Sequence, residues 1–336
     1  MDDVKFMRAA LLEARRGAGR TSPNPAVGAV IVRGGRIIAR GFHRSAGMPH
    51  AEIEAITALK NPRSASGATL CVTLEPCSTQ GRTPPCVDAI LRHGFARGVI
   101  GAIDPNPAHA GRGVEMLRAA GVEVVTGILH DECRYLNVAF NKWIVTGTPF
   151  VIAKAALSLD GRLTRPPGEG QWLSNAASRA DAHRLRASVD AILVGAGTIR
   201  ADNPRLTVRG VAGARQPWRV ILSRRIPLPK SAHIFTDEFR DRTLVYRDRT
   251  LRAVLRDLGR RQITSVLIEG GGTVLGEAID RRLVDRFHIY LAPMICGGPD
   301  AIGGRGAAST ATSLALKNPR YTRIGDDILM TAECCA

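Results

Sequence analysis

Three side chains in the first third of the chain have the types and the spacing of a catalytic zinc site. His50 and Glu52 stand in a His-Ala-Glu triplet, Cys77 follows a Glu-Pro pair, and Cys86 follows two prolines. A zinc ion that activates water needs three protein ligands and one open position, and one nitrogen with two thiolates is such a set. Glu52 lies two residues beyond the histidine, where a carboxylate can move protons without binding the metal. The pattern therefore predicts a metal site made by His50, Cys77 and Cys86, with its own proton-transfer group.

Two other interpretations of these residues are a structural zinc site and a coincidence of residue types. A structural site normally has four ligands and a close C-x-x-C pair, whereas eight residues separate Cys77 from Cys86. The nearest spare histidine, His43, lies in a different predicted loop. Cys71 lies in an apolar run and is predicted to be a small buried residue of a strand. The catalytic interpretation is therefore favoured.

The segments around these side chains predict strands and helices in alternation. Residues 27–32 and 36–40 are predicted to be strands joined by a Gly-Gly turn. His50 precedes an apolar-periodic helix over 51–59, and Cys86 precedes another over 87–93, directly after the two prolines. Ligands at two helix N-termini lie near the positive ends of both dipoles, which favours a thiolate at Cys86.

The second half of the chain alternates in the same way. Its first strand is preceded by a predicted helix over 131–143 and a Thr-Gly-Thr-Pro turn at 146–149. Strands are predicted at 150–155, 191–194, 219–222, 243–246, 265–268 and 287–291, and helices at 176–187 and 250–261. Such alternation is typical of α/β layer folds. We therefore expect two α/β domains, residues 1–147 and residues 148–336.

Two glycine-rich turns in the second half could approach phosphate groups closely. Residues 195–198 (Gly-Ala-Gly-Thr) follow one predicted strand, and residues 270–273 (Gly-Gly-Gly-Thr) follow another and precede an apolar segment. Glycine allows close backbone approach, and a helix N-terminus offers free N–H groups. Neither turn is a G-x-G-x-x-G in a leading βαβ unit, so an ordinary Rossmann fold is not expected.

The composition narrows the classes of partner. The 336 residues carry a formal net charge of +17, and aromatic residues make up only 4%. Because the positive residues are dispersed and stacking surfaces are scarce, small phosphorylated ligands are expected rather than nucleic acid. Neither a signal peptide nor a membrane span is expected, since no apolar run is long enough. Seven cysteines in such a chain fit a reducing cytoplasm better than a disulfide framework.

Five segments of the first half contain sequence motifs that are typical of one known enzyme family. They are Thr21–Gly28 (TSPNPAVG), Pro49–Glu52 (PHAE), Thr73–Cys86 (TLEPCSTQGRTPPC), Asp104–Pro107 (DPNP) and Gly111–Gly113 (GRG). This half resembles the deaminase half of the bifunctional deaminase/reductase family of riboflavin biosynthesis. The wide cysteine spacing separates that family from cytidine and transfer-RNA deaminases. The resemblance implies a cytidine-deaminase-like α/β/α fold, in which activated water attacks the ring carbon that bears an amino group.

The resemblance also implies roles for polar residues around the metal. Asn24 would hydrogen-bond the substrate, and the alternative is a local turn residue before Pro25. Glu75 could orient the metal site from outside the ligand set, or it could cap a helix. Glu52 would take the proton of the attacking water and pass protons to the ring nitrogen and the leaving amine.

Segments of the second half carry the rest of the pattern. They are Lys154, Ser158–Gly161 (SLDG), Gly168–Trp172 (GEGQW), Val194–Arg209, Ile268–Thr273 (IEGGGT) and Leu291–Gly298 (LAPMICGG). They resemble the reductase half of the same family, a domain similar to dihydrofolate reductase. By family position, NADPH would contact Ala156, Trp172, Thr198, Asp202, Ser223, Gly271, Gly272 and Thr273. The substrate would contact Gly170, Arg186, Leu206, Arg209 and Glu269, with the arginines suited to a ribose phosphate.

Three departures from the family pattern affect this half. Asn203 stands where the family usually has a second Asp, and the segment Thr164–Pro167 (TRPP) replaces a small polar one. Gly170 stands where a serine is common. These departures concern the substrate contacts and leave the cofactor segments intact.

Together the two halves imply two consecutive reactions. The first is zinc-dependent deamination of a diaminopyrimidinone ribosylamino 5′-phosphate, and the second is NADPH-dependent reduction of the ribosyl side chain to ribityl. Candidates for the proton donor of the second step are Lys154, Asp202 and bound water. Alternatives are a deaminase with an inactive reductase-like domain, and a nucleic-acid deaminase with a basic appended domain. The resemblance also implies a homo-oligomer.

Overall fold

The computed structural model describes residues 2–80, 84–163, 172–224, 227–297 and 301–334. The chain divides into two units, Met1–Gly147 and Thr148–Ala336, and each is built on one sheet. Within the described ranges, no helix has both the length and the apolar character needed to cross a membrane.

The sheet of the first unit has five strands in the order β2-β1-β3-β4-β5. These strands are β1 (Gly28–Arg33), β2 (Arg36–Phe42), β3 (Thr69–Leu74), β4 (Arg97–Ala102) and β5 (Glu123–Thr126). β1 is antiparallel to both β2 and β3, whereas β3, β4 and β5 are parallel. Gly34 and Gly35 make the turn between β1 and β2 with φ of 54° and 73°, a conformation that glycine adopts at little cost.

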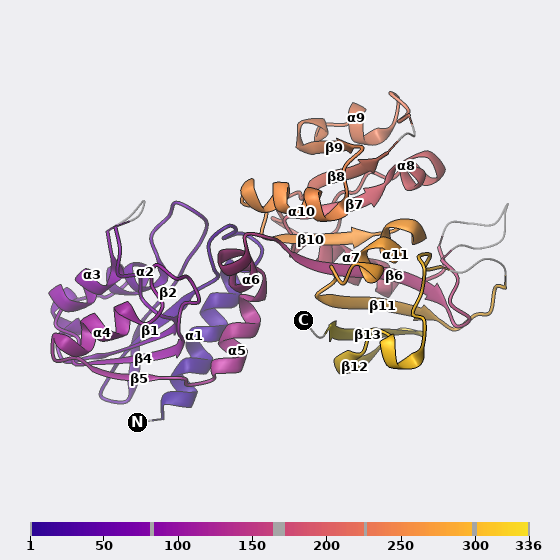
Figure 1. Ribbon diagram of the computed structural model, residues 1–336. Coiled ribbons are helices and arrows are strands. Elements are labelled where there is room, and N and C mark those ends of the chain that lie inside the picture. Colours follow the sequence, from indigo (N-terminus) through magenta and orange to yellow (C-terminus); the bar gives the residue numbers. More distant parts are fainter. Residues whose placement is uncertain (1, 81–83, 164–171, 225–226, 298–300, 335–336) are drawn as a thin grey trace. The chain divides into compact units, whose positions relative to one another are not determined.

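Helices cover both faces of this sheet (Figure 1). One face packs against α2 (Ala51–Thr57), α3 (Cys86–Arg92) and α4 (Arg112–Ala119), and the other against α1 (Asp3–Gly17) and α5 (His130–Leu136). In β1, Ala29 and Ile31 belong to the first core, while Val30 and Val32 belong to the second. Successive side chains of a strand point to opposite faces, so a strand that is apolar throughout is suited to this central place.

The helix predicted over 131–143 is in fact two helices. α5 and α6 (Val138–Thr146) meet at Asn137, which has φ −115° and ψ 24°. The Asn137 amide accepts a hydrogen bond from the Ala26 N–H at 2.8 Å and donates one to the Ala26 carbonyl at 2.9 Å. This pair of bonds satisfies the side chain and holds Asn137 at the break between the helices. The prediction was wrong because the bonds join residues far apart in the sequence.

The sheet of the second unit has eight strands in the order β12-β13-β11-β6-β10-β7-β8-β9. They are β6 (Phe150–Ser158), β7 (Ala191–Gly195), β8 (Trp218–Ser223), β9 (Thr243–Arg247), β10 (Ser265–Glu269), β11 (Arg286–Ala292), β12 (Leu316–Ile324) and β13 (Asp327–Cys334). The strands from β11 to β9 in this order are parallel, and β13 and β12 add an antiparallel edge.

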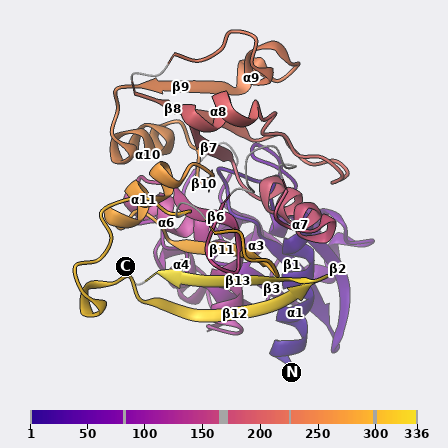
Figure 2. The same cartoon turned by 90° about the vertical axis from the view of Figure 1, so that its right-hand side faces the viewer.

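Helices also cover both faces of the second sheet (Figure 2). α10 (Leu251–Arg260) and α11 (Gly272–Asp280) pack on one face, and α7 (Ala176–Ala187), α8 (Ala196–Asp202) and α9 (His233–Thr236) pack on the other. The central strand β10 sends Val266 and Ile268 into the first core and Leu267 into the second. The predicted strands at 150–155, 191–194, 219–222, 243–246, 265–268 and 287–291 are all present.

Two features of the second unit differ from the sequence interpretation. Residues 195–198 are not a loop: Gly195 ends β7 and is also the N-cap of α8, which begins at Ala196. The β12–β13 hairpin was not predicted. Eight of the nine residues of β12 are exposed, so the strand lacks the apolar alternation by which strands are recognised in a sequence.

Candidate functional site

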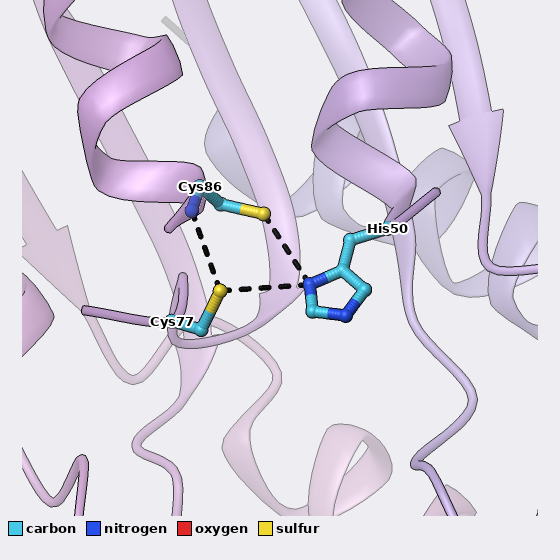
Figure 3. Close-up of side chains that lie close together, drawn as sticks. All are labelled: His50, Cys77 and Cys86. Carbon is cyan, nitrogen blue, oxygen red and sulfur yellow. Dashed lines mark hydrogen bonds between the residues drawn. The ribbon is translucent and has the colours of Figure 1, made fainter. Parts of the chain in front are cut away.

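The three predicted zinc ligands converge in the first unit (Figure 3). Their ligand atoms all lie within 4.8 Å of one another. His50 Nδ1 is 3.5 Å from Cys77 Sγ and 3.4 Å from Cys86 Sγ. Zinc bonds of about 2.05 Å to nitrogen and about 2.3 Å to sulfur at a tetrahedral angle give an N···S edge of about 3.6 Å. The donor atoms therefore fit three corners of a tetrahedral zinc site.

Local structure explains why these three side chains meet. His50 is the N-cap of α2, Cys86 is the first residue of α3, and Cys77 lies in the segment that follows β3. Backbone bonds fix this segment, because the Cys86 N–H donates to Cys77 Sγ at 3.3 Å and the Val87 N–H donates to the Cys77 carbonyl at 3.3 Å. Both helix N-termini direct positive dipole ends to the cluster, which favours thiolates and an anionic nucleophile.

The two thiols have opposed protonation tendencies. A hydrogen bond with the Cys86 side chain lowers the pKa of Cys77, and the same contact, together with burial, raises the pKa of Cys86. The cluster by itself therefore favours one thiolate and one thiol. A divalent cation among the three donors would favour both thiolates, because metal binding displaces protons from its ligands.

Glu52 lies in the first turn of α2 and is only 3% exposed. Burial raises the pKa of its carboxyl to about 7, and the nearby His50 and the Cys86 side chain oppose this rise in part. A carboxyl group that titrates near neutral pH can both accept and release a proton. Glu52 thus has the burial and the position that a proton-transfer group beside the metal needs.

His43 is a neighbour of the site that the sequence interpretation placed elsewhere. Its ring lies edge-on to the His50 ring, with centroids 5.3 Å apart. His43 Nδ1 lies 3.0 Å from the Pro49 carbonyl, and Nε2 lies 3.1 Å from Asn24 Nδ2. Burial lowers the pKa of His43, so the neutral ring is favoured. The sequence holds no local sign of this contact, because it joins two loops on either side of a hairpin.

Glu75 caps a helix, which was one of its two predicted roles. Its carboxylate accepts hydrogen bonds from the N–H groups of Gly113 at 2.9 Å and Val114 at 3.3 Å, in the first turn of α4. It also accepts from Asp104 at 3.1 Å and Gly111 at 2.9 Å. Glu75 therefore ties the segments around 104 and 111 to the end of β3.

In the second unit, three of the singled-out residues form one charge cluster, in which Glu269 is buried and Lys154 and Arg186 are half-buried. Arg186 of α7 donates to both carboxylate oxygens of Glu269 at 3.1 and 2.8 Å through Nε, and its Nη2 lies 2.6 Å from Oε2. Lys154 Nζ lies 3.9 Å from Glu269 Oε1. The register places Lys154 of β6 directly beside Glu269 of β10. Burial lowers the pKa of Lys154, and the Glu269 charge opposes this shift.

The glycine turn after β10 lies beside Thr198. Gly270 and Gly271 have φ of 109° and 77°, and α11 begins at Gly272. A Cβ on Gly271 would lie 3.3 Å from Thr198 Oγ1. The first N–H groups of a helix have no partner within the helix, so Gly272 and Thr273 offer donors next to the Thr198 hydroxyl. A backbone without side chains at Gly270 and Gly271, next to these donors, is suited to a phosphate group of a dinucleotide.

Two of the remaining predicted residues of this unit lie toward the carboxyl ends of parallel strands. Ala156 lies late in β6, and the buried Ser223 ends β8. Trp172 is 55% exposed beneath the Arg179 guanidinium, and the exposed Asp202 ends α8. Ligands of open α/β sheets bind at this edge.

Two further predicted substrate residues lie in the segment after α8. Leu206 is buried with φ of 53°, and Arg209 contacts His183. Asn203, one of the departures, accepts a hydrogen bond from the His233 N–H at 2.9 Å and so caps α9. Gly170 and the segment Thr164–Pro167 lie outside the described residues.

Comparisons with known proteins agree with both units. Residues 149–330 match the family model of the RibD C-terminal domain, and residues 1–102 match the cytidine and deoxycytidylate deaminase zinc-binding region. The riboflavin biosynthesis protein RibD of Bacillus amyloliquefaciens is 40% identical, over 97% of this chain and 95% of that protein.

Solved structures are similar over nearly the whole chain. RibD of Acinetobacter baumannii (form 2) has a TM-score of 0.90 at 36% identity, over 99% of both chains. The deaminase/reductase of Thermotoga maritima has a TM-score of 0.88 at 35% identity, again over 99% of both chains. Because the second unit matches a reductase domain, a nucleic-acid deaminase with an unrelated basic domain is disfavoured.

The enzyme uses zinc in its deaminase unit and NADPH in its reductase unit, and its substrates are small molecules. The chain belongs to the RibD family, the bifunctional deaminase/reductases of riboflavin biosynthesis.

Proposed function

We propose that the first unit releases ammonia from a diaminopyrimidinone ribosylamino 5′-phosphate, with zinc held by His50, Cys77 and Cys86. The observation that supports this most strongly is the separation of His50 Nδ1 from the two sulfurs, 3.5 and 3.4 Å, which is close to the edge of a tetrahedral zinc site. When bound there, zinc activates water as the nucleophile. The T. maritima relative is a diaminohydroxyphosphoribosylaminopyrimidine deaminase/5-amino-6-(5-phosphoribosylamino)uracil reductase.

Glu52 is the proton-transfer group of this proposal. It takes the proton that the attacking water gives up, and passes protons to the ring nitrogen and then to the exocyclic amine. The C–O bond forms when water adds to the ring carbon and the ring nitrogen takes a proton. The C–N bond to the exocyclic amine breaks afterwards, when the protonated amine leaves as ammonia. Asn24 hydrogen-bonds the pyrimidine, with its amide held by His43.

The second unit is proposed to reduce the ribosyl side chain of the deaminated product to ribityl. NADPH supplies the hydride. Lys154 is the proposed proton donor to the sugar oxygen, because its half-buried ammonium lies beside Glu269 and its lowered pKa eases release of the proton. Glu269, held by Arg186, orients the sugar. The proposed substrate contacts are Gly170, Arg186, Leu206, Arg209 and Glu269.

NADPH is proposed to lie along the carboxyl ends of the parallel strands. Its phosphates face the first N–H groups of α11 and the Thr198 hydroxyl, beside Gly271. The proposed contacts are Ala156, Trp172, Thr198, Asp202, Ser223, Gly271, Gly272 and Thr273.

A coupled assay on the zinc-loaded full chain tests both proposals. Ammonia release and NADPH oxidation are followed separately with the diaminopyrimidinone ribosylamino phosphate as substrate. We expect ammonia first and then an equal amount of NADP⁺. Ammonia without NADPH oxidation, also with the deaminated product as substrate, would contradict the proposal for the second unit. NADPH oxidation of the deaminated product without ammonia release would contradict the proposal for the first.

We also propose that the enzyme acts in the cytoplasm as a homo-oligomer. The cysteines of the described residues are free, which is consistent with a reducing compartment. A relative 40% identical in sequence matches 97% of this chain. Light scattering of the purified chain measures the oligomeric state, and a monomer mass would contradict that part.

A further inference from the structure

His183 connects α7 to the segment that carries Arg209. It lies one turn before Arg186, so both side chains are on the same side of α7. Arg186 Nη1 donates to the Thr207 carbonyl at 3.1 Å, and the Arg209 N–H donates to His183 Nδ1 at 3.2 Å. Two residues of α7 thus fix the backbone from Thr207 to Arg209 beside the buried Glu269.

The hydrogen bond from the Arg209 backbone decides which nitrogen of His183 carries the proton. A backbone N–H can only donate, so Nδ1 accepts and the proton of the neutral ring is on Nε2. Burial lowers the pKa of His183, and the charges of Arg186 and Arg209 lower it further, against smaller effects of Glu269 and the Thr207 backbone. The neutral ring with Nε2–H is therefore the form present at neutral pH.

Nε2–H lies next to a second donor. The distance from His183 Nε2 to Arg209 Nη2 is 3.5 Å, and a guanidinium nitrogen has no acceptor capacity. The two N–H groups cannot satisfy each other. One oxygen at about 2.9 Å from each nitrogen can accept from both.

The charge around this donor pair favours an anion. All three nitrogens of Arg186 are engaged, with its charge paired to Glu269. Among the described ion pairs, Arg209 has no carboxylate partner, and its side chain is exposed. A positive charge beside a neutral N–H donor is suited to a ligand with several anionic oxygens, such as a phosphate monoester.

We propose that His183 is a substrate-binding residue of the reductase, whose Nε2–H binds the 5′-phosphate of the ribosylamino substrate together with the Arg209 guanidinium. This inference rests on the proposed reductase function. A neutral imidazole adds a donor to the phosphate site without adding charge, and its Nδ1 at the same time holds the Arg209 backbone in place.

Two substitutions separate the two roles of the ring. In His183→Asn the amide oxygen can still accept from the Arg209 N–H, but no donor reaches the position of Nε2. In His183→Gln a longer amide can restore a donor there. Both are made in the zinc-loaded full chain, and ammonia release from the other unit shows that the chain is folded and active.

We expect His183→Asn to raise the KM for the deaminated phosphorylated substrate about tenfold or more, because a hydrogen bond to a charged group is lost. His183→Gln should recover part of this loss, and the KM for NADPH should not change. With the same substrate lacking its phosphate, the wild type and His183→Asn should have equal kcat/KM.

Three results would overturn the inference. A substrate KM within twofold of wild type in His183→Asn would leave the ring only an anchor for the Arg209 backbone. An equal loss with the dephosphorylated substrate would show that the phosphate is not the group bound. A raised KM for NADPH but not for NADH would assign the donor pair to the cofactor's 2′-phosphate. A wild-type chain without reductase activity would instead contradict the proposed function itself.

Discussion

Asn24 and His43 form a hydrogen bond whose direction is fixed by a third group. His43 Nδ1 lies 3.0 Å from the Pro49 carbonyl, which can only accept, so Nδ1 carries the proton of the neutral ring. Nε2, 3.1 Å from Asn24 Nδ2, is then the acceptor and the amide donates. The Asn24 carbonyl oxygen is thereby directed away from His43 and kept available to a ligand.

Asn24→Asp tests this arrangement. A carboxylate cannot donate to Nε2, so we expect its orientation to change and the kcat/KM for ammonia release to fall by about tenfold, the cost of a hydrogen bond at a polar site. NADPH oxidation with the deaminated product is the internal control and should be unchanged. Ammonia release within twofold of wild type would leave Asn24 a turn residue before Pro25.

Glu52→Gln removes the proposed proton transfer while keeping the size of the side chain. We expect ammonia release to fall at least about a hundredfold, because general acid–base catalysis contributes about that much or more. Zinc content, measured by atomic absorption, should remain at one ion per chain, since Glu52 is not a proposed ligand. A rate within a few-fold of wild type would show that another group moves the protons.

Cys86→Ser tests the ligand set. A hydroxyl is a poor substitute for a thiolate at zinc, so we expect loss of stoichiometric zinc and of ammonia release, while NADPH oxidation of the deaminated product continues. Treating the wild type with a chelator should have the same effect, and added zinc should reverse it. Cys71→Ala is the matched control, because Cys71 is fully buried in β3 and burial raises the pKa of its thiol to about 12. Full zinc and activity in Cys86→Ser would refute the proposed set.

The metal donors could be predicted from the sequence because their chemistry is rare and their flanking residues are local. His50 and Cys86 each stand at the start of a short helix. Apolar runs also marked several strands of both sheets, although not the β12–β13 hairpin. His43 and His183 could not be predicted in the same way. Each acquires its place from a partner in a distant segment, Asn24 for one and Arg209 for the other. A buried polar contact of this kind has no periodic signature.

Glu269→Gln tests whether the Glu269 charge sets the pKa of Lys154. Burial lowers the pKa of Lys154 and the Glu269 charge opposes this, so removal of that charge should lower the pKa further. If Lys154 donates the proton, reductase kcat is high while Lys154 is protonated and declines as the pH rises through its pKa. The decline should therefore begin at a lower pH in Glu269→Gln than in wild type.

The measurement for Glu269→Gln is the pH profile of kcat for NADPH oxidation, with ammonia release as the control for folding. A lower kcat with an unshifted profile would show that Glu269 orients the sugar but does not set the ionisation of Lys154. In that case a bound water or Asp202 would become the candidate proton donor.

Gly271→Ala tests the proposed phosphate site of the second unit. Gly271 has φ of 77° and ψ of 102°, a backbone conformation that glycine adopts far more readily than alanine, and the added Cβ would lie 3.3 Å from Thr198 Oγ1. We expect the Kd for NADPH, measured by fluorescence titration, to rise about tenfold, because the new methyl group occupies space proposed for the phosphate. Gly306→Ala is the matched control, since Gly306 has φ of 71° with no atom within 4 Å of an added Cβ. It also has a positive φ and lies in the same unit. An equal loss of NADPH affinity in both variants would therefore trace the effect to backbone strain and leave the Gly271 segment without a role in binding.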